Sequence, residues 1–267
     1  MPPRLTVAIP FEYQEKWVGG VYYVRNLLKG LALLPDGARP SVIVIGDDAA
    51  GLDYLRRETG LGDLRRVASA AIRKVAARSN IPFRYRPAPG DIPIDVLLVG
   101  SPMGFEARAV QWIPDFQEER LPQFFSAAEL KARRQRNRKW LTLHRHIMVS
   151  SQDVRSDLER FYPGFDGRVH ILNFASFPEV YPAPPEIAAL RQKYALPERY
   201  FICNNQLWQH KNHATILRAL REIPSDKAPP VVFTGKEHDY RDRGYAASVR
   251  TLAVELGVAD HVHFLGF

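Results

Sequence analysis

Short apolar segments alternate with helical patterns along nearly the whole sequence. Six of these segments have the length of buried strands: 5–10, 41–46, 95–99, 109–113, 146–149 and 169–172. Apolar residues recur at helical spacing from Val21 to Leu31, and a further helix is expected around 64–72. Ser151 is expected to cap another helix, which continues to Phe161. Such alternation is typical of parallel strands, because each connection must cross back over the sheet. Residues 1–172 are therefore predicted to form one doubly wound α/β domain.

A proline-rich stretch separates this domain from a second, shorter series. Residues 173–198 are expected to form a linker with a lead-in helix. Beyond it, the pattern predicts strands near 200–203, 230–235 and 261–267 and helices near 214–220 and 245–256. This series is roughly half of a doubly wound sheet domain. Residues 199–267 are therefore interpreted as the first part of a C-terminal domain that is cut off at Phe267.

The composition indicates a soluble globular protein. Hydrophobic residues make up 46% of the chain and charged residues 25%. The apolar runs are too short to cross a membrane, and the first residues lack a secretory pattern. The single cysteine, Cys203, excludes an intramolecular disulfide and a multi-cysteine metal site. A cytoplasmic location is the resulting expectation.

The formal net charge is +8, and much of the excess lies in residues 131–139. A capping-box pattern from Ser126 to Glu129 is expected to open the helix that carries them. Positive charge favours anionic partners such as nucleic acid, an acidic membrane surface or phosphorylated small molecules. The same residues would equally suit a solvated helix face. Charge alone selects none of these partners.

Gly19 and Gly20 are expected in the loop between the first strand and its helix. Glycines at this place let the backbone approach an anionic group, which the free N–H groups at a helix N-terminus favour. Two glycines in a loop are also consistent with a simple turn. The pattern does not match the full dinucleotide-binding fingerprint.

The segment 204–213 follows the first strand of the second series and precedes a helix. It should therefore lie at the carboxyl edge of the sheet, where α/β folds bind their ligands. Asn205, Gln206 and Lys211 supply amide and ammonium groups, and a lysine is a point charge suited to a diphosphate. The alternative is a surface loop whose amides cap the helix.

The segment 112–125 follows a strand of the first domain and carries Asp115, Glu118 and Arg120 at the same kind of sheet edge. These charged side chains could contact a ligand. The alternative is a loop whose apolar residues, Phe124 and Phe125 among them, anchor it in the core. The sequence leaves both interpretations open.

Taken in order along the chain, these motifs resemble the family 4 retaining glycosyltransferases. They are similar to a bacterial group-1 subset that is often associated with surface polysaccharides. The resemblance covers nearly the whole chain, and its most specific segments are 206–213 and 112–125. It implies a GT-B fold, in which two Rossmann-like domains face each other across a cleft. The donor would lie mainly on the second domain and the acceptor mainly on the first, with no metal or other cofactor required.

The resemblance also implies roles for single residues. Gly20 would approach the donor phosphate or the transferred sugar, and Lys211 would contact the diphosphate. Asp115, Glu118 and Arg120, on the first domain, would lie on the acceptor side. Gln206 stands where many members have arginine, and Glu118 and Arg120 stand near positions where related proteins often have histidine. The paired-glutamate motif of the family should lie beyond residue 267, so no catalytic residue is assigned and the 267-residue chain alone is expected to be inactive.

The function that follows is transfer of a sugar, with retained configuration, from a nucleotide diphosphate sugar to a saccharide or lipid-linked acceptor. Peripheral contact with an anionic membrane is a further expectation from the basic helix. One alternative is a non-catalytic sugar-phosphate or polysaccharide-binding protein of the same fold. A nucleic-acid binder that uses residues 133–139 is disfavoured, because no recognised module accompanies the charges. Nucleic acid is therefore not expected as a partner.

Overall fold

The computed structural model describes residues 5–14, 18–62, 64–68, 94–100, 109–177, 183–239 and 241–267. The chain divides into two compact units. The first unit comprises Met1–Pro122 and Ala127–Pro178, and the second unit comprises Gln123–Ser126 and Glu179–Phe267. Each unit is built on its own parallel sheet.

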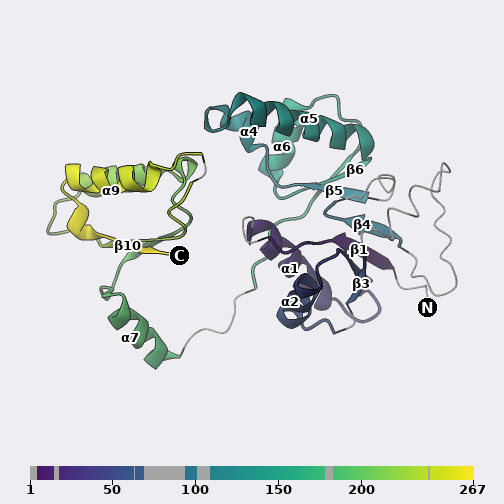
Figure 1. Cartoon of the computed structure of the whole chain (residues 1–267), viewed down its shortest axis with the longest axis horizontal. Helices are drawn as coiled ribbons and strands as arrows, with labels where there is room; N and C mark the ends of the chain where they lie inside the picture. The colour runs from purple at the N-terminus through teal and green to yellow at the C-terminus, as the bar shows by residue number, and fades with distance from the viewer. Residues whose placement is uncertain are drawn as a thin grey trace. The chain divides into compact units, whose positions relative to one another are not determined.

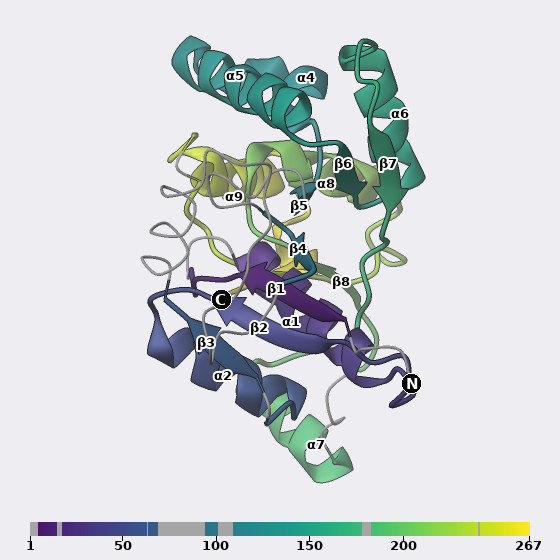
Figure 2. The same cartoon turned by 90° about the vertical axis from the view of Figure 1, so that its right-hand side faces the viewer.

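The sheet of the first unit has seven strands in the order β3-β2-β1-β4-β5-β6-β7, side by side in Figure 2. Their bounds are β1 Thr6–Pro10, β2 Ser41–Ile45, β3 Arg65–Val67, β4 Val96–Leu98, β5 Ala109–Ile113, β6 His146–Val149 and β7 Arg168–Ile171. Every pairing is parallel. The chain proceeds from β1 towards β3 on one side and then continues from β4 on the other. This reversal makes the carboxyl ends of β1 and β4 a topological switch point.

The helices of the first unit are α1 Val18–Ala32, α2 Ala49–Thr59, α4 Gln117–Arg120, α5 Ala127–Leu143 and α6 Gln152–Phe161. A 3₁₀ turn, η3, spans Pro122–Phe124. Val21, Val24 and Leu28 form one stripe of α1 and pack in a core with Val7 and Ile9 of β1. Burying each such side chain contributes about 1.5–3 kcal/mol. The core thus fixes the start of α1 near the carboxyl end of β1.

The helix α6 begins where the sequence predicted. The Ser151 hydroxyl accepts a hydrogen bond of 3.2 Å from the backbone N–H of Val154. Val154 and Leu158 of this helix pack in one core with Ile147 of β6. The cap and the apolar spacing therefore confirm the expected helix.

The second unit contains the three-stranded parallel sheet β10-β9-β8. Its elements are α7 Pro184–Lys193, β8 Phe201–Asn204, η4 Gln209–Lys211, α8 His213–Arg221, β9 Val231–Thr234, α9 Tyr245–Glu255, η5 Ala259–His261 and β10 Val262–Gly266 (Figure 1). Leu217 and Leu220 of α8 form one core with Phe233 of β9 and Val249 of α9. The element order is the one that the sequence pattern predicted for this half of the chain.

Two local expectations are wrong. The helix expected around 64–72 is the strand β3 over Arg65–Val67, and 69–72 lie outside the described residues. Pairing with β2, in which Ile43 faces Arg65, overrides the helical spacing. The glycines expected in a loop lie inside the first turn of α1, which begins at Val18.

Candidate functional site

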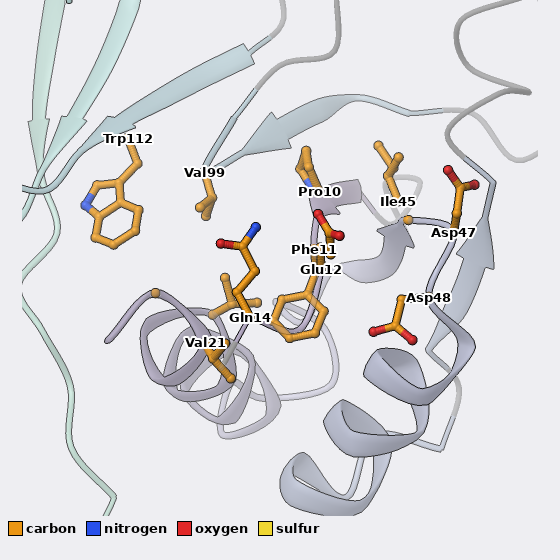
Figure 3. A pocket seen from close by; sticks show the side chains of 13 residues that line it. Pro10, Phe11, Glu12, Gln14, Val21, Ile45, Asp47, Asp48, Val99 and Trp112 are labelled. Carbon is orange, nitrogen blue, oxygen red and sulfur yellow. The ribbon is translucent and has the colours of Figure 1, made fainter. Parts of the chain in front are cut away.

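A cavity of about 420 Å³ lies at the carboxyl edge of the first unit's sheet (Figure 3). Its lining residues come from the segments that follow β1, β2 and β4, from β5 and from the first turns of α1. All strands of this sheet run in parallel, so their carboxyl ends meet at one edge. The cavity therefore lies at the switch point beside β1, where doubly wound folds bind ligands.

Two glycines shape this cavity. Gly20 is buried and belongs to the lining, so backbone rather than a side chain faces the cavity there. A Cβ on Gly46 would collide with the carbonyl oxygen of Phe11. That close approach is held by a hydrogen bond of 2.9 Å from the Phe11 N–H to the Ile45 carbonyl. Any larger residue at position 46 would push the ends of β1 and β2 apart.

One side of the cavity is acidic and the opposite side is apolar. Asp47 and Asp48 lie together on one side in Figure 3, and Val99 and Trp112 lie on the other. Glu12 adds a third carboxylate, and no lysine or arginine is among the described residues that line the cavity. Carboxylates accept hydrogen bonds from hydroxyls, whereas they repel phosphates. A carboxylate about 8 Å from one negative charge of a phosphate would weaken its binding by about 0.5 kcal/mol in water.

The apolar side is held rigid by ring contacts. Trp112 stacks on Tyr23 with 3.9 Å between ring centroids and 7° between ring planes. Its indole Nε1 donates a hydrogen bond of 3.0 Å to the Ser150 hydroxyl. Burial raises the pKa of Tyr23 to about 12, so the phenol stays neutral at physiological pH. The indole thus offers a fixed surface against which the C–H face of a sugar can pack.

The predicted acceptor residues lie in and beside α4, and none of them lines this cavity. Asp115 is exposed and accepts a hydrogen bond of 3.3 Å from the Gln117 N–H. The Arg120 guanidinium lies 2.7 Å from the Asp157 carboxylate and 2.8 Å from that of Asp153, which raises the pKa of Arg120 above its ordinary value. These contacts attach α4 to α6.

Glu118 is buried, with only 1% of its surface exposed. One of its oxygens accepts a hydrogen bond of 2.6 Å from the Asn137 side chain, and the other lies 3.9 Å from the Arg133 guanidinium. Glu118 therefore ties α4 to α5 in the interior of the unit. A role of Asp115, Glu118 and Arg120 in acceptor binding stays a prediction.

The segment that follows β8 depends on one glycine. Gly235 has a φ of +125°, and a Cβ there would collide with the Asn205 carbonyl and lie 2.9 Å from the Gln206 nitrogen. The Leu207 N–H then donates a hydrogen bond of 3.0 Å to the Lys236 carbonyl. Only glycine accommodates this backbone conformation without strain. The segment is thereby held against the turn after β9.

Asp239 and Arg241 fix the middle of this segment, although the sequence analysis did not single them out. The buried Asp239 carboxylate accepts a hydrogen bond of 3.2 Å from the Gln209 N–H and pairs with Arg241 at 3.4 Å. An Arg241 nitrogen lies 2.9 Å from His210 Nδ1. Burial, with the nearby Arg241 and Lys211, lowers the pKa of His210 to about 4. His210 is therefore neutral at pH 7, and Nδ1 accepts from the guanidinium.

Lys211 is exposed, and no carboxylate of the described residues lies within ion-pair distance of it. The Asn205 amide donates to Cys203 Sγ at 3.4 Å, while its Oδ1 is buried without a partner in the described part of the chain. The first N–H of α8, at His213, already donates to the Tyr245 hydroxyl at 3.1 Å. An anion at this segment would therefore be held by the Lys211 side chain rather than by the helix N-terminus.

Several glycosyltransferases of known structure resemble this chain. Anabaena HepE, crystallised with UDP and glucose, matches it with a TM-score of 0.62 and 15% identity over 99% of this chain and 70% of its own. A Rickettsia africae glycosyltransferase matches with a TM-score of 0.57 and 12% identity over 98% and 68% of the two chains. Arabidopsis thaliana UGT89C1 matches with a TM-score of 0.50 and 12% identity over 99% and 70%. This chain has the GT-B fold. No family model and no curated protein match the sequence.

Within this GT-B chain, the residues that the sequence singled out lie in three places, of which one is α4 and its flank, with Asp115, Glu118 and Arg120. Gly20 lines the cavity beside β1, and Gly19 precedes it in α1. Asn205, Gln206 and Lys211 lie together after β8. The acidic lining of the cavity was missed, although the rule that ligands lie just beyond strand ends would have pointed to it.

Two kinds of feature are absent from the described residues of the GT-B chain. None of their helices combines the length and the apolar character that crossing a bilayer requires. They also hold no cluster of three or more histidine, cysteine or acidic side chains suited to a metal ion.

Proposed function

We propose that this chain belongs to a glycosyltransferase that moves a sugar from a nucleotide diphosphate sugar to a hydroxyl of a saccharide or lipid-linked acceptor. The observation that carries the proposal is the opposite charge of two carboxyl-edge sites. The cavity of the first unit is lined by carboxylates, whereas the segment after β8 presents the exposed ammonium group of Lys211. The first suits the hydroxyls of an acceptor, and the second suits a diphosphate.

On the donor side, Lys211 stabilises the negative charge that develops on the departing diphosphate. The neighbouring cation, Arg241, is engaged by Asp239 and His210, so it orders the segment instead of moving towards a ligand. At about 4 Å, one pair of unit charges contributes about 1 kcal/mol in water and about 4 kcal/mol near a protein surface. A diphosphate carries more than one charge, so a single lysine has a large effect.

On the acceptor side, sugar hydroxyls donate to Glu12, Asp47 and Asp48, and the apolar face of the ring packs on Trp112. The absence of basic residues among the described lining directs phosphates away from this cavity. Gly20 leaves room there for the transferred sugar beside the first turn of α1, which is one of the two roles that the resemblance implied for it. Retention of configuration, a role in surface polysaccharide synthesis and independence of metal are part of the proposal.

The solved structures support the nucleotide-sugar half of the proposal. HepE was crystallised with UDP and with UDP-glucose, and its fold covers nearly all of this chain. At 14–15% sequence identity, these structures show the fold of this chain but not the roles of its residues. The base and the sugar of the donor therefore have to come from binding experiments.

The test is calorimetric titration of the chain with UDP, other nucleoside diphosphates and their sugars. Lys211→Ala should raise the Kd of the best ligand about 10- to 100-fold, which corresponds to about 1.4–2.8 kcal/mol. Lys211→Arg should stay within about five-fold of wild type, because it keeps the positive charge. The matched control is Lys227→Ala, which removes an exposed lysine from another loop of the second unit. Equal affinities for Lys211→Ala and wild type would contradict the donor assignment.

Catalysis is expected to need more than these residues. Asp239, whose carboxylate contacts the donor segment at Gln209, is engaged by Arg241 and by backbone, so it is not free to orient a donor sugar. We expect residues 1–267 to bind nucleotide diphosphates without transferring sugar. Turnover by the chain alone, measured with nucleotide sugars and saccharide acceptors, would show that a catalytic group has been overlooked.

A further inference from the structure

A second cavity, of about 540 Å³, lies at the opposite edge of the first unit's sheet. It is lined by the end of α5, by the residues that precede β6 and by the Tyr162–Asp166 segment that precedes β7. It therefore opens at the amino ends of the strands, whereas the cavity of the proposed acceptor lies at their carboxyl ends. The proposed glycosyl transfer makes no use of it.

One residue of this lining has an unmet hydrogen-bonding group. His144 is 96% buried, since only 4% of its surface is exposed. Its Nδ1 lies 2.9 Å from the Trp140 carbonyl oxygen of the preceding helical turn. Because a carbonyl can only accept, Nδ1 donates to it, and in the neutral imidazole Nε2 then keeps a free lone pair. Nε2 is buried and has no partner among the residues that the structure describes.

The two ring nitrogens of an imidazole point in different directions. With Nδ1 engaged by its own helix, Nε2 is the ring nitrogen left for a ligand of the cavity. Nε2 is closed to water in this structure, so a ligand hydroxyl reaches it by displacing the side chains that cover it. A buried acceptor without a donor is unfavourable, so a hydroxyl that donates to Nε2 would gain more there than at an exposed site.

The rest of the lining favours an anion. Arg138 and Arg145 supply two guanidinium groups, against the single carboxylate of Asp166. The Asp166 carboxylate lies 3.3 Å from the Arg145 guanidinium. This ion pair is exposed and contributes little to stability, so a phosphate group can displace Asp166 from Arg145. The Thr142 hydroxyl already donates to the Arg138 carbonyl at 2.9 Å, so it offers only lone pairs to a ligand. Leu141 and Phe165 provide an apolar wall.

We propose that this cavity binds a phosphate ester that carries at least one free hydroxyl. The guanidinium groups of Arg138 and Arg145 contact the phosphate, and the hydroxyl donates to His144 Nε2. Such chemistry occurs both in a soluble polyol phosphate and in a glycerophosphate lipid headgroup. The site shares no residue with the acidic cavity or with the segment that carries Lys211, so its test does not depend on the proposed function.

The first experiment titrates the full chain with glycerol 3-phosphate, inorganic phosphate and glycerol, and follows binding by calorimetry and NMR. Glycerol 3-phosphate should bind at least ten-fold more tightly than either part alone. Arg138→Gln should weaken binding of both phosphates about ten-fold. The matched control, Arg160→Gln, removes an exposed arginine of α6 that does not line the cavity, and it should leave both affinities within two-fold.

A second variant separates the role of His144 from that of charge. His144→Leu should abolish the preference for glycerol 3-phosphate over inorganic phosphate while it leaves phosphate affinity within two-fold. If it unfolds the unit, Arg138→Gln still tests the site, because that side chain is exposed. Equal affinities of the chain for all three probes, or equal effects of Arg138→Gln and Arg160→Gln, would overturn the proposal.

Vesicles identify the source of the ligand. If the chain binds phosphatidylglycerol vesicles more tightly than phosphatidylserine vesicles of equal charge, and glycerol 3-phosphate competes, the ligand is a lipid headgroup. If glycerol 3-phosphate binds in solution and the two kinds of vesicle do not differ, the ligand is a soluble phosphate ester. If a vesicle preference is lost equally in Arg138→Gln and Lys131→Gln, general charge on α5 explains it and the site is refuted.

Discussion

The segments that follow the first strand of each unit have the same topological place and opposite chemistry. After β1, the chain passes Glu12 and Gln14 on its way to α1 and contributes to an acidic cavity. After β8, it passes His210 and Lys211 on its way to α8 and presents positive charge. A strand–loop–helix connection thus fixes where a ligand lies, while the side chains decide whether it is a hydroxyl or a phosphate.

The two strands also differ in their neighbours. β1 pairs with β2 on one side and with β4 on the other. The strand order therefore reverses at β1, and the connections on its two sides lead away from each other. β8 pairs with β9, and no other described strand pairs with it. Phe201 and Ile202 of β8 are 66% and 58% exposed. β8 is therefore an apolar edge strand within the described part of the second unit.

The largest effect is expected from Gly235→Ala, which disturbs the second unit only. The methyl group would collide with the Asn205 carbonyl at a φ of +125°, so we expect a loss of about 3 kcal/mol in the free energy of unfolding of this unit. The control is Gly257→Ala, at a φ of +68° with open space around it, which should cost about 1 kcal/mol. Hydrogen exchange read separately for amides of the two units would check both values. Similar losses for the two variants would show that the segment after β8 is not held by Gly235.

The charge contrast itself predicts a reciprocal pattern of binding. Asp47→Asn with Asp48→Asn should weaken binding of neutral methyl hexosides about five-fold, since each lost charged acceptor contributes about 1 kcal/mol or less at this open site. UDP affinity should not change. Asp48 makes no cap hydrogen bond to α2, so the helix should survive its substitution.

Lys211→Ala is the counterpart of the Asp47→Asn, Asp48→Asn variant, and saturation-transfer NMR should show the opposite changes in affinity for UDP and for the hexosides. It should weaken UDP binding and leave the hexosides unaffected. If either change affects both ligands equally, the division of hydroxyl and phosphate binding between the two units is wrong.

The sequence predicted the elements whose pattern is local. The stripe Val21, Val24 and Leu28 and the cap at Ser151 need only neighbouring residues, and both are found as expected. The strand β3 was missed, because Arg65 and Arg66 are exposed and the strand exists only through its pairing with β2.

Features that depend on distant residues could not be predicted. The pairing of His210 with Arg241 joins positions 31 residues apart. The burial of Glu118 under Asn137 contradicts the usual exposure of glutamate in a charged helix. The acidic cavity requires the order of the strands, which places the segment after β2 beside the one after β1. Sequence patterns give elements, whereas sites arise from the packing of elements.

The lowered pKa of His210 predicts a smaller, pH-dependent effect on the second unit. In the folded state the pKa is about 4, against an ordinary value of 6.5. The unfolded chain therefore binds more protons between pH 6.5 and pH 4, and stability should fall as the pH decreases through this window. Because His210 is partly exposed, we expect a loss of only about 1–2 kcal/mol. Urea unfolding of wild type and His210→Gln at pH 7 and pH 4.5 would check this. If both proteins lose the same free energy of unfolding between the two pH values, His210 is not the cause.

The smallest effect concerns the basic helix α5 and any contact with an anionic membrane. Its positive charges are of two kinds. Arg134 lies 2.9 Å from the Glu119 carboxylate and stabilises the fold, whereas Lys131 and Lys139 are exposed. Only charges without an internal partner can be attracted to lipid without breaking a contact inside the protein. Each should contribute on the order of 1 kcal/mol near an anionic surface.

Lys139→Gln should therefore lower the partition of the chain onto anionic vesicles about five-fold at low salt, which corresponds to about 1 kcal/mol. Arg134→Gln should instead lower thermal stability slightly and change partition less, because the charge of Glu119 is left behind. Sedimentation with vesicles of increasing anionic content would compare the two variants, and high salt should abolish the difference. If Arg134→Gln and Lys139→Gln reduce partition equally, net charge alone drives the contact. In the acidic cavity and in the positive segment after β8, by contrast, the arrangement of the charges and not their sum would still select the ligand.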